Sequence, residues 1–339
     1  MITSRTPSSQ PHSLGGQARS ARQANSGSSY LRVTDHKIVL RRYHCRLMRP
    51  GRVLLYTAEI NRRRPACLLL LIDQSFSMSE PWGTEGHSKA EALMASVNRL
   101  LGNAVIQCSK GGNKILDYFE VGVIGYGADV QFALHGTGLD RPLLPISEVA
   151  NGPLRIDEVL QKESDGAGGI IQVPRSFPVW VDPVSNGPTP MVEALRVTEG
   201  VLSAWCAEHP TSFPPIVINL TDGVSTDGDP RVAADKVRAV RTNDGPTLMF
   251  NVHLSNAVVN EIVLPNAADA LPDDYAAMLF SMSSELPVQM AEAAAGLGYK
   301  VHPGTRGFLY NAKATSVIEF LDIGTRPINP GGFPELPSA

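Results

Sequence analysis

The chain has 339 residues, of which 43% are hydrophobic and 19% charged, and its formal net charge at pH 7 is −3. This length allows one large domain or two small ones, with a hydrophobic core that needs no disulfide bonds. The four cysteines are widely spaced and form no CxxC pair, which argues against a disulfide framework or a zinc site.

The cellular compartment is predicted from the same features. Reduced thiols are typical of a cytoplasmic protein. The longest apolar run, residues 66–72, is too short to cross a bilayer, and the N-terminus lacks the apolar core of a secretory signal. We therefore expect a cytoplasmic protein that does not contact the membrane.

Charge is distributed unevenly along the chain. Residues 1–64 contain 13 Lys and Arg but only two acidic residues, whereas the remainder contains 17 basic and 31 acidic residues. A basic arm on an acidic body can bind nucleic acid, an acidic protein or the body itself. The arm has few aromatic residues and no nucleic-acid-binding motif, which favours its own body or a protein partner over nucleic acid.

The two ends of the chain are predicted to lie outside the main domain. Residues 1–29 are rich in Ser, Gly, Gln and Arg and predict a disordered basic tail. Residues 30–64 place two apolar segments on either side of Pro50-Gly51, which suits a type II turn and predicts a basic β-hairpin extension. Residues 327–339 are rich in Pro and Gly and are interpreted as a C-terminal tail.

Between residues 65 and 326, strand-like and helix-like patterns alternate. Strands are expected at residues 66–75, 118–134, 214–223, 247–255 and 307–312. The second is either a single strand or a strand that continues into a hairpin, and the last is expected at the edge of the sheet. Helices are expected at residues 88–108, 189–209, 229–242, 285–298 and 314–324. This alternation predicts an α/β fold with a doubly wound, mostly parallel central sheet flanked by helices. Residues 136–186 are too long for an ordinary connection and predict a functional surface loop or a small insertion.

Polar side chains follow two of the expected strands where each strand ends. Asp73 ends the first strand, and Ser75 and Ser77 follow it by two and four residues. Asp222 ends the strand expected at residues 214–223, and Thr189 begins a helix. Because parallel strands present their carboxyl ends at one edge of a sheet, we expect these side chains to converge there.

This set of side chains suits a hard divalent cation. Mg²⁺ takes six oxygen ligands in a tight octahedron, usually with few carboxylates. Two carboxylates and three hydroxyls leave a coordination position open for a carboxylate from another molecule. We expect Mg²⁺, with Mn²⁺ or Ca²⁺ as alternatives, and no softer metal, because the set contains neither Cys nor His.

Three motifs resemble those of von Willebrand factor A (VWA) domains. "DQSFS" at residues 73–77 matches their DxSxS signature, "GPTPMVEAL" resembles their threonine loop, and "LTDG" resembles their second aspartate loop. The motifs occur in the family's order, and the resemblance covers about residues 65–325. It implies a Rossmann-like VWA fold with a metal-ion-dependent adhesion site (MIDAS) made of Asp73, Ser75, Ser77, Thr189 and Asp222. The family usually has glycine where this chain has Phe76, which can narrow the rim or supply an apolar contact.

The chain resembles most the intracellular VWA proteins of bacteria. Some of these accompany protein kinases and PP2C-type phosphatases in stress-response or tellurium-resistance gene clusters, and others work beside AAA+ ATPases. The resemblance implies a non-enzymatic adaptor that binds a Glu or Asp of such a protein partner through the metal ion, in a stress-signalling or defence assembly.

Two other functions stay open. The domain can be a scaffold that binds through its basic arm or its long loop without metal. It can also be a metal-dependent hydrolase or phosphotransferase, although aspartate-nucleophile phosphatases need a second acid where this chain has Ser75. No Ser-His-Asp or Cys-His arrangement is evident as a sequence motif.

Several of these residues also have purely structural interpretations. Asp73 and Asp222 can cap the helices after their strands, and Thr189 is a good N-cap for its own helix. Asp227 and Asp229 are predicted to serve as a cap and a solvated turn, because their spacing does not fit a calcium loop. Three glycines within a strand pattern are expected to allow close packing rather than nucleotide binding, namely Gly122, Gly125 and Gly127.

Overall fold

The computed structural model describes residues 55–325, with gaps at 83–85, 111–113, 135–140, 165–168 and 256–259. The expected N-terminal tail, most of the expected β-hairpin extension and the expected C-terminal tail lie outside the described residues. Within the described part, no helix combines the length and apolar character that a membrane crossing needs.

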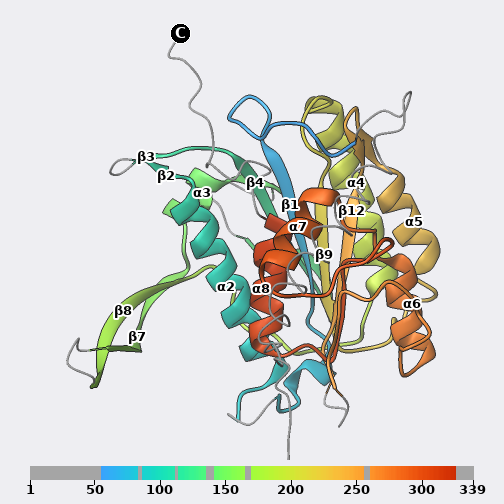
Figure 1. Cartoon of the computed structure of the whole chain (residues 1–339). Coiled ribbons are helices and arrows are strands. Elements are labelled where there is room, and N and C mark those ends of the chain that lie inside the picture. Colours follow the sequence, from blue (N-terminus) through green and yellow to red (C-terminus); the bar gives the residue numbers. More distant parts are fainter. Residues whose placement is uncertain are drawn as a thin grey trace, which may run out of the picture.

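A mostly parallel sheet, eight-stranded within the described residues, forms the centre of the molecule (Figure 1). Its strand order is β13-β14-β12-β9-β1-β4-β5, and β6 also pairs with β4. The five inner strands are parallel: β14 (Phe308–Tyr310), β12 (Leu248–His253), β9 (Ile216–Thr221), β1 (Ala66–Asp73) and β4 (Phe119–Tyr126). The outer strands are antiparallel to their neighbours: β13 (Ile262–Val263), β5 (Val130–Phe132) and β6 (Leu144–Pro145).

Helices cover both faces of this sheet (Figure 1). One face carries α2 (Lys89–Gln107), α3 (Ile146–Asn151), α7 (Val288–Gly296) and α8 (Ala314–Thr325). The other face carries α4 (Met191–Glu208), α5 (Arg231–Ala239) and α6 (Asp274–Met282). The expected doubly wound α/β fold is therefore confirmed.

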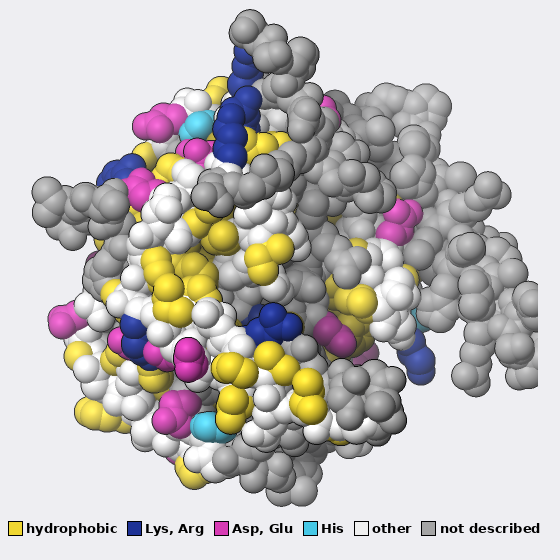
Figure 2. All heavy atoms as spheres, turned by 90° about the vertical axis from the view of Figure 1, so that its left-hand side faces the viewer, with side chains coloured by type: hydrophobic (Ala, Val, Ile, Leu, Met, Phe, Trp, Pro, Cys, Tyr) yellow, Lys and Arg dark blue, Asp and Glu magenta, His cyan; other side chains and the backbone are white. Residues whose placement is uncertain are grey.

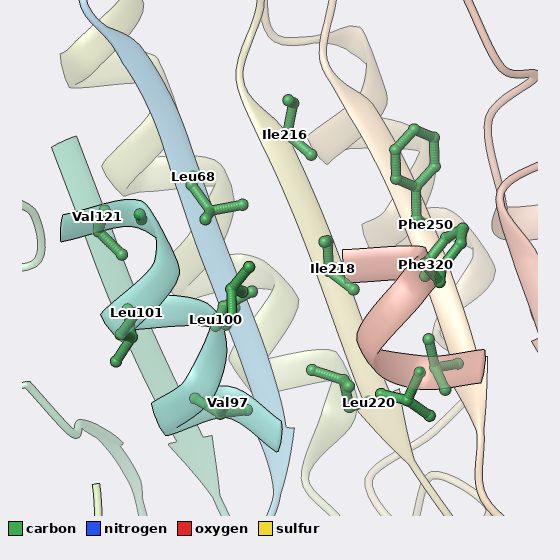
Figure 3. Close-up of a cluster of buried hydrophobic side chains, with 14 of the residues drawn as sticks. Leu68, Val97, Leu100, Leu101, Val121, Ile216, Ile218, Leu220, Phe250 and Phe320 are labelled. Atoms are coloured by element: carbon green, nitrogen blue, oxygen red, sulfur yellow. The ribbon is translucent and has the colours of Figure 1, made fainter. Parts of the chain in front are cut away.

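Strand β1 contributes to the cores on both faces of the sheet. Leu68 and Leu70 pack with α2 and α8, whereas Leu69 and Leu71 pack with α4 on the opposite face. Figure 3 shows the first core, with side chains from β1, β4, β9 and β12 beside those from α2 and α8. Burial on both faces explains the continuous apolar run in the sequence, because no position along the strand faces water.

Several elements differ from the sequence-based expectation. Strand β14 is not an edge strand, since it lies between β12 and β13. Neither β13 nor α6 was expected. The helix expected at residues 229–242 ends at Ala239, because Val240 is extended and residues 241–242 pair with residues 245–246 as β10 and β11.

The stretch 136–186 is more than one surface loop. Its described first part supplies β6 and α3, and Ile146 is fully buried in the core. It then forms a separate antiparallel ribbon of β7 (Arg155–Ser164) and β8 (Ile170–Val179), which projects from the body (Figure 1). The chain returns to the body at Trp180, whose backbone N–H donates to the buried Asn98 side chain.

The described end of the basic arm lies on the body. The Asp244 carboxylate accepts hydrogen bonds from the backbone N–H groups of Thr57 and Ala58, each at 2.9 Å. The backbone N–H of Tyr56 donates to the Asp244 carbonyl oxygen. These hydrogen bonds fix the position of the segment that precedes β1.

Candidate metal-binding site

Asp73 is fixed at the carboxyl end of β1. Its side chain is buried; Oδ1 accepts a hydrogen bond from the Ser75 backbone N–H at 2.9 Å, and Oδ2 accepts one from Thr221 Oγ1 at 2.6 Å. Burial raises the pKa of Asp73 to about 6, against the opposing effect of these hydrogen bonds. The fold therefore holds this carboxylate in place although its charge is poorly solvated.

Hydrogen bonds connect both serines of the signature to the second aspartate. Ser75 Oγ lies 3.0 Å from Ser77 Oγ, and Ser77 Oγ donates to Asp222 Oδ1 at 2.6 Å. Asp222 directly follows β9, the neighbour of β1 in the sheet. The two parallel strands thus deliver their polar ends to the same place, as the sequence predicted.

The surroundings of Gly223 show how close to one another the oxygens of the candidate metal ligands lie. We call Asp73, Ser75, Ser77, Thr189 and Asp222 the donor residues, because their oxygens would donate electron pairs to a metal ion. A methyl group on its Cα would lie 3.4 Å from Thr189 Oγ1, 3.6 Å from Ser77 Oγ and 3.9 Å from Asp73 Oδ2. Oxygens from the signature loop and from the Thr189 loop therefore lie close to one point beside Gly223, which belongs to the second aspartate loop. The hydrogen bonds of Ser75 and Asp222 to Ser77, together with these three distances, show that the five residues predicted from the sequence lie together.

The Thr189 loop is attached to the second aspartate loop by paired hydrogen bonds. The backbone N–H of Thr189 donates to Thr226 Oγ1, and the backbone N–H of Thr226 donates to the Thr189 carbonyl oxygen, both at 3.0 Å. The Asp227 carboxylate accepts from the backbone N–H groups of Val192 and Glu193 at the start of α4. Asp227 is therefore the cap of α4, and the expectation that Thr189 caps it was wrong.

Other residues also take the capping roles considered for the two site aspartates. Ser88 and Glu91 form a capping box at the start of α2. The Asp229 carboxylate accepts a hydrogen bond from the backbone N–H of Arg231, the first residue of α5. Asp73 and Asp222 are therefore not needed as caps of these helices.

Lys89, which belongs to none of the sequence motifs, lies against Asp222. Lys89 Nζ is 2.7 Å from Asp222 Oδ2 and 2.7 Å from Glu80 Oε2. The side chains of Lys89 and Asp222 are 5% and 0% exposed, whereas that of Glu80 is 56% exposed. Burial disfavours the charged amine, but hydrogen bonds to Asp222 and Glu80 outweigh it and raise the pKa of Lys89. A signal was present, because a lysine at the first position of a helix opposes the helix dipole.

Two exposed apolar side chains flank the donor residues. Phe76, between the two serines, is 68% exposed, and Val224, next to Gly223, is 62% exposed. The backbone N–H of Phe76 donates to the Gly187 carbonyl oxygen, which holds the signature loop against the Thr189 loop. Phe76 thus presents its ring to solvent, where it can contact another molecule.

The expected close packing of the glycines in and after β4 is confirmed. A Cβ atom on Gly125 would lie 2.3 Å from Gln74 Oε1, and one on Gly127 would lie 2.7 Å from the Gln74 carbonyl oxygen. A Cβ atom on Gly122 would lie 2.3 Å from the Pro142 carbonyl oxygen. Gly125 and Gly127 therefore let the backbone approach the signature loop closely, and Gly122 lets it approach Pro142.

The chemistry of the donor set fits a hard cation better than a soft one. The described residues contain no group of three or more His, Cys, Asp and Glu that could hold a metal ion. An ion at Asp73 and Asp222 would therefore depend on the hydroxyls of Ser75, Ser77 and Thr189 as well. Oxygen ligands of this kind are those that Mg²⁺, Mn²⁺ and Ca²⁺ prefer.

No family model matches the sequence, and no curated protein matches it. Among solved structures, proximal thread matrix protein 1 from the mussel byssus is similar at 15% identity and a TM-score of 0.41, over 79% of this chain and 48% of that one. The pilus adhesin SpaC from Lactobacillus rhamnosus GG is similar at 13% identity and a TM-score of 0.42, over 78% of this chain and 30% of that one.

The vWF domain of the type V pili tip protein Mfa5 from Porphyromonas gingivalis is similar at 11% identity and a TM-score of 0.29, over 71% of this chain and 54% of that one. The matched region thus spans about half or less of the length of these three proteins. At such low identities and scores, the fold of this chain is defined by its own strand order and by the helices on both faces of the sheet.

Proposed function

We propose that this chain is a protein-interaction module that binds its partner through a divalent cation. The cation, Mg²⁺ with Mn²⁺ or Ca²⁺ as alternatives, would be held in a MIDAS arrangement by Asp73, Ser75, Ser77, Thr189 and Asp222. The observation that supports this most strongly is the convergence of the oxygens of Asp73, Ser77 and Thr189 beside Gly223, with Asp222 hydrogen-bonded to Ser77.

The chain's own residues would position the ion and leave one side open. Thr221 and the Ser75 backbone fix the orientation of the Asp73 carboxylate, and Ser77 fixes that of Asp222. A bound cation supplies a Lewis-acidic position that an incoming carboxylate can occupy. Two carboxylates leave a divalent ion without excess negative charge, so a Glu or Asp of a partner is the ligand that best completes the site.

The exposed residues beside the site indicate a further property of the partner. Phe76 and Val224 offer apolar surface next to the proposed ion. A partner segment that carries a bulky apolar residue beside its Glu or Asp would bury part of this surface, which adds to the attraction between the ion and the carboxylate.

The cellular setting is proposed from the resemblance of the three motifs and, for the compartment, from the widely spaced cysteines. We place the chain as a non-enzymatic, cytoplasmic adaptor of the bacterial intracellular type. Its partner would be a kinase, a PP2C-type phosphatase or an AAA+ ATPase system in a stress-signalling or defence assembly.

The proposal is tested by affinity capture from native lysate on the immobilised full chain, with Mg²⁺ or with EDTA. We expect EDTA, Asp73→Ala and Thr189→Ala each to release the captured partner. Asp229→Ala is the matched control, because its exposed carboxylate binds Arg231 outside the donor set. Capture that survives EDTA and both site variants would contradict the proposal.

Two observations favour the metal-independent scaffold as a second candidate. Lys89 already neutralises Asp222, and the ribbon of β7 and β8 exposes large apolar side chains. Figure 2 shows the face from which the ribbon projects, with hydrophobic side chains at its surface. Under this reading, Leu160→Glu abolishes capture while Thr189→Ala has no effect. The reverse result supports the metal-dependent module.

A further inference from the structure

We propose that Lys89 is a built-in cation that competes with the divalent ion for Asp222, so that the two occupy this carboxylate alternately. The inference rests on the proposed function, because it requires an ion at the same site. It assigns to Lys89 a regulatory role that the donor residues themselves do not have.

Both oxygens of Asp222 are engaged in the structure. Oδ1 accepts from Ser77 Oγ at 2.6 Å, and Oδ2 accepts from Lys89 Nζ at 2.7 Å. A serine hydroxyl has lone pairs and can turn to become a ligand of the ion. A protonated lysine has no lone pair and carries the same sign of charge as the ion, so the two repel each other in a buried site.

Glu80 gives the released lysine a place to go. Its Oε2 lies 2.7 Å from Lys89 Nζ, and its side chain is much more exposed than that of Asp222. The backbone N–H of Lys89 also donates to the Glu80 carbonyl oxygen, which keeps the two residues together. The flexible lysine side chain can therefore leave Asp222 while its ammonium group stays paired with Glu80.

The consequence is a site with moderate ion affinity when no partner is present. Lys89 compensates the charge of the buried Asp222 and thereby stabilises the metal-free site. An ion must displace it, and the carboxylate of a partner adds negative charge that favours the ion over the lysine. Ion and partner would therefore bind cooperatively, each increasing the affinity for the other.

The test is calorimetric titration of the full chain with Mn²⁺. We expect Lys89→Met to bind Mn²⁺ at least tenfold more tightly than the wild type. Lys236→Met, which removes the same charge from the exposed side of α5, should bind like the wild type. If the wild type binds Mn²⁺ and Lys89→Met binds it equally or more weakly, this inference is wrong and the proposed function stands. If neither chain binds Mn²⁺, the proposed function fails as well.

A second measurement needs no variant that alters folding. Lysine acetylation of the wild-type chain, read by mass spectrometry, should be slow at Lys89 without metal and faster at saturating Mn²⁺. Acetylation of the exposed Lys236 should not change. A Lys89 amine that stays equally protected at saturating Mn²⁺ would overturn the competition.

Discussion

Gly223 leaves room at the point toward which the donor oxygens converge. The absence of a side chain there keeps Thr189 Oγ1 and Ser77 Oγ accessible to a common ligand. A Cβ atom at this position would make only ordinary van der Waals contacts, at 3.4 to 3.9 Å. A methyl group can therefore be placed in this space without a clash that would destabilise the fold.

We expect Gly223→Ala to lower Mg²⁺ affinity at least tenfold, because the added methyl group fills the space between the oxygens, while Mg²⁺ tolerates little distortion. The unfolding temperature of the metal-free protein should change by less than about 3 °C, which corresponds to less than about 1 kcal/mol for a chain of this size. Calorimetry and thermal unfolding measure the two effects. Gly200→Ala, where a Cβ atom meets nothing within 4 Å, is the matched control. Unchanged Mg²⁺ affinity in Gly223→Ala would place the ion elsewhere.

His253, at the end of β12, is a buried imidazole whose Nδ1 has no hydrogen-bond partner in the described structure. It stacks on Tyr310 and contacts the edge of Tyr275. Burial lowers the pKa of His253 to about 4; the charges of Asp273 and Asp222 oppose this shift, and that of Lys89 supports it. The folded state therefore binds fewer protons than the unfolded state between pH 4 and 6.5. The contribution of His253 to the free energy of unfolding is fully present above pH 6.5 and is lost as the pH falls from 6.5 to 4.

Replacement of His253 by Phe keeps an aromatic ring in place but removes the titrating group. We expect the free energy of unfolding of wild type to fall by about 2 kcal/mol between pH 7 and pH 5 through this residue. In His253→Phe, the free energy of unfolding should not show this decrease of about 2 kcal/mol. Urea unfolding at the two pH values measures it, and identical pH profiles for both proteins would contradict the assignment.

Lys89 shows the limit of sequence reasoning at the scale of residues. The five donor residues could be predicted because they follow strands or belong to motifs with fixed spacing. Lys89 belongs to no motif, and its contact with Asp222 joins residues 133 positions apart. Only the packing of α2 across the ends of β1 and β9 brings them together.

At the scale of elements, the attachment of α4 to the second aspartate loop positions Thr189. Asp227 binds two backbone N–H groups of the first turn of α4, and Thr226 exchanges hydrogen bonds with Thr189. These hydrogen bonds therefore hold the start of α4 against the loop. Asp227 therefore stabilises the start of α4 and also helps to position Thr189 in the site.

Asp227→Ala should lower the free energy of unfolding by about 1 kcal/mol, as expected for a lost helix cap. It should also weaken Mg²⁺ binding, because Thr189 loses part of its support. Asp229→Ala removes the hydrogen bond to the first N–H group of α5 and an exposed ion pair with Arg231, so it should cost a similar free energy of unfolding but leave Mg²⁺ binding unchanged. Urea unfolding and Mn²⁺ titration of the two variants provide the measurements. Equal effects of both substitutions on Mn²⁺ binding would show that the Asp227 cap does not position the site.

The elements that the sequence predicted are those with strong periodic or continuous apolar patterns. The runs in β1, β9 and β12 predicted buried parallel strands because every position in them is buried. Strand β13 has two residues and shows no period, so β14 was mistaken for the edge. Pairing between strands far apart in the chain decides such edges, and no local pattern contains it.

At the scale of the whole molecule, the ribbon of β7 and β8 stands apart from the core. Ile156 and Pro178 are paired at its base, and Trp180 begins the buried return of the chain. Its large exposed apolar side chains are Ile156, Val159, Leu160, Ile170 and Ile171, and Leu154 is exposed just before β7. An apolar surface of this kind on a projecting ribbon is typical of an interaction element.

Replacement of residues 157–177 by Asn-Gly, a two-residue hairpin turn, should leave the fold intact. We expect cooperative thermal unfolding and unchanged Mn²⁺ affinity, because the buried Val179 is kept and none of the described core residues or of the five site residues lies within residues 157–177. Loss of cooperative unfolding would instead show that the ribbon supports the domain. Loss of partner capture with intact Mn²⁺ binding would assign the ribbon to the binding surface.

The central claim is that a divalent ion lies between the loops at the carboxyl end of β1 and β9. Anomalous diffraction from crystals of the full chain grown with Mn²⁺ tests this most directly. We predict one strong peak beside Gly223, within bonding distance of the Ser75 and Ser77 hydroxyl oxygens, with Lys89 turned from Asp222 toward Glu80. Crystals at saturating Mn²⁺ that show no peak there, with the Lys89 ammonium group still on Asp222, would contradict the account.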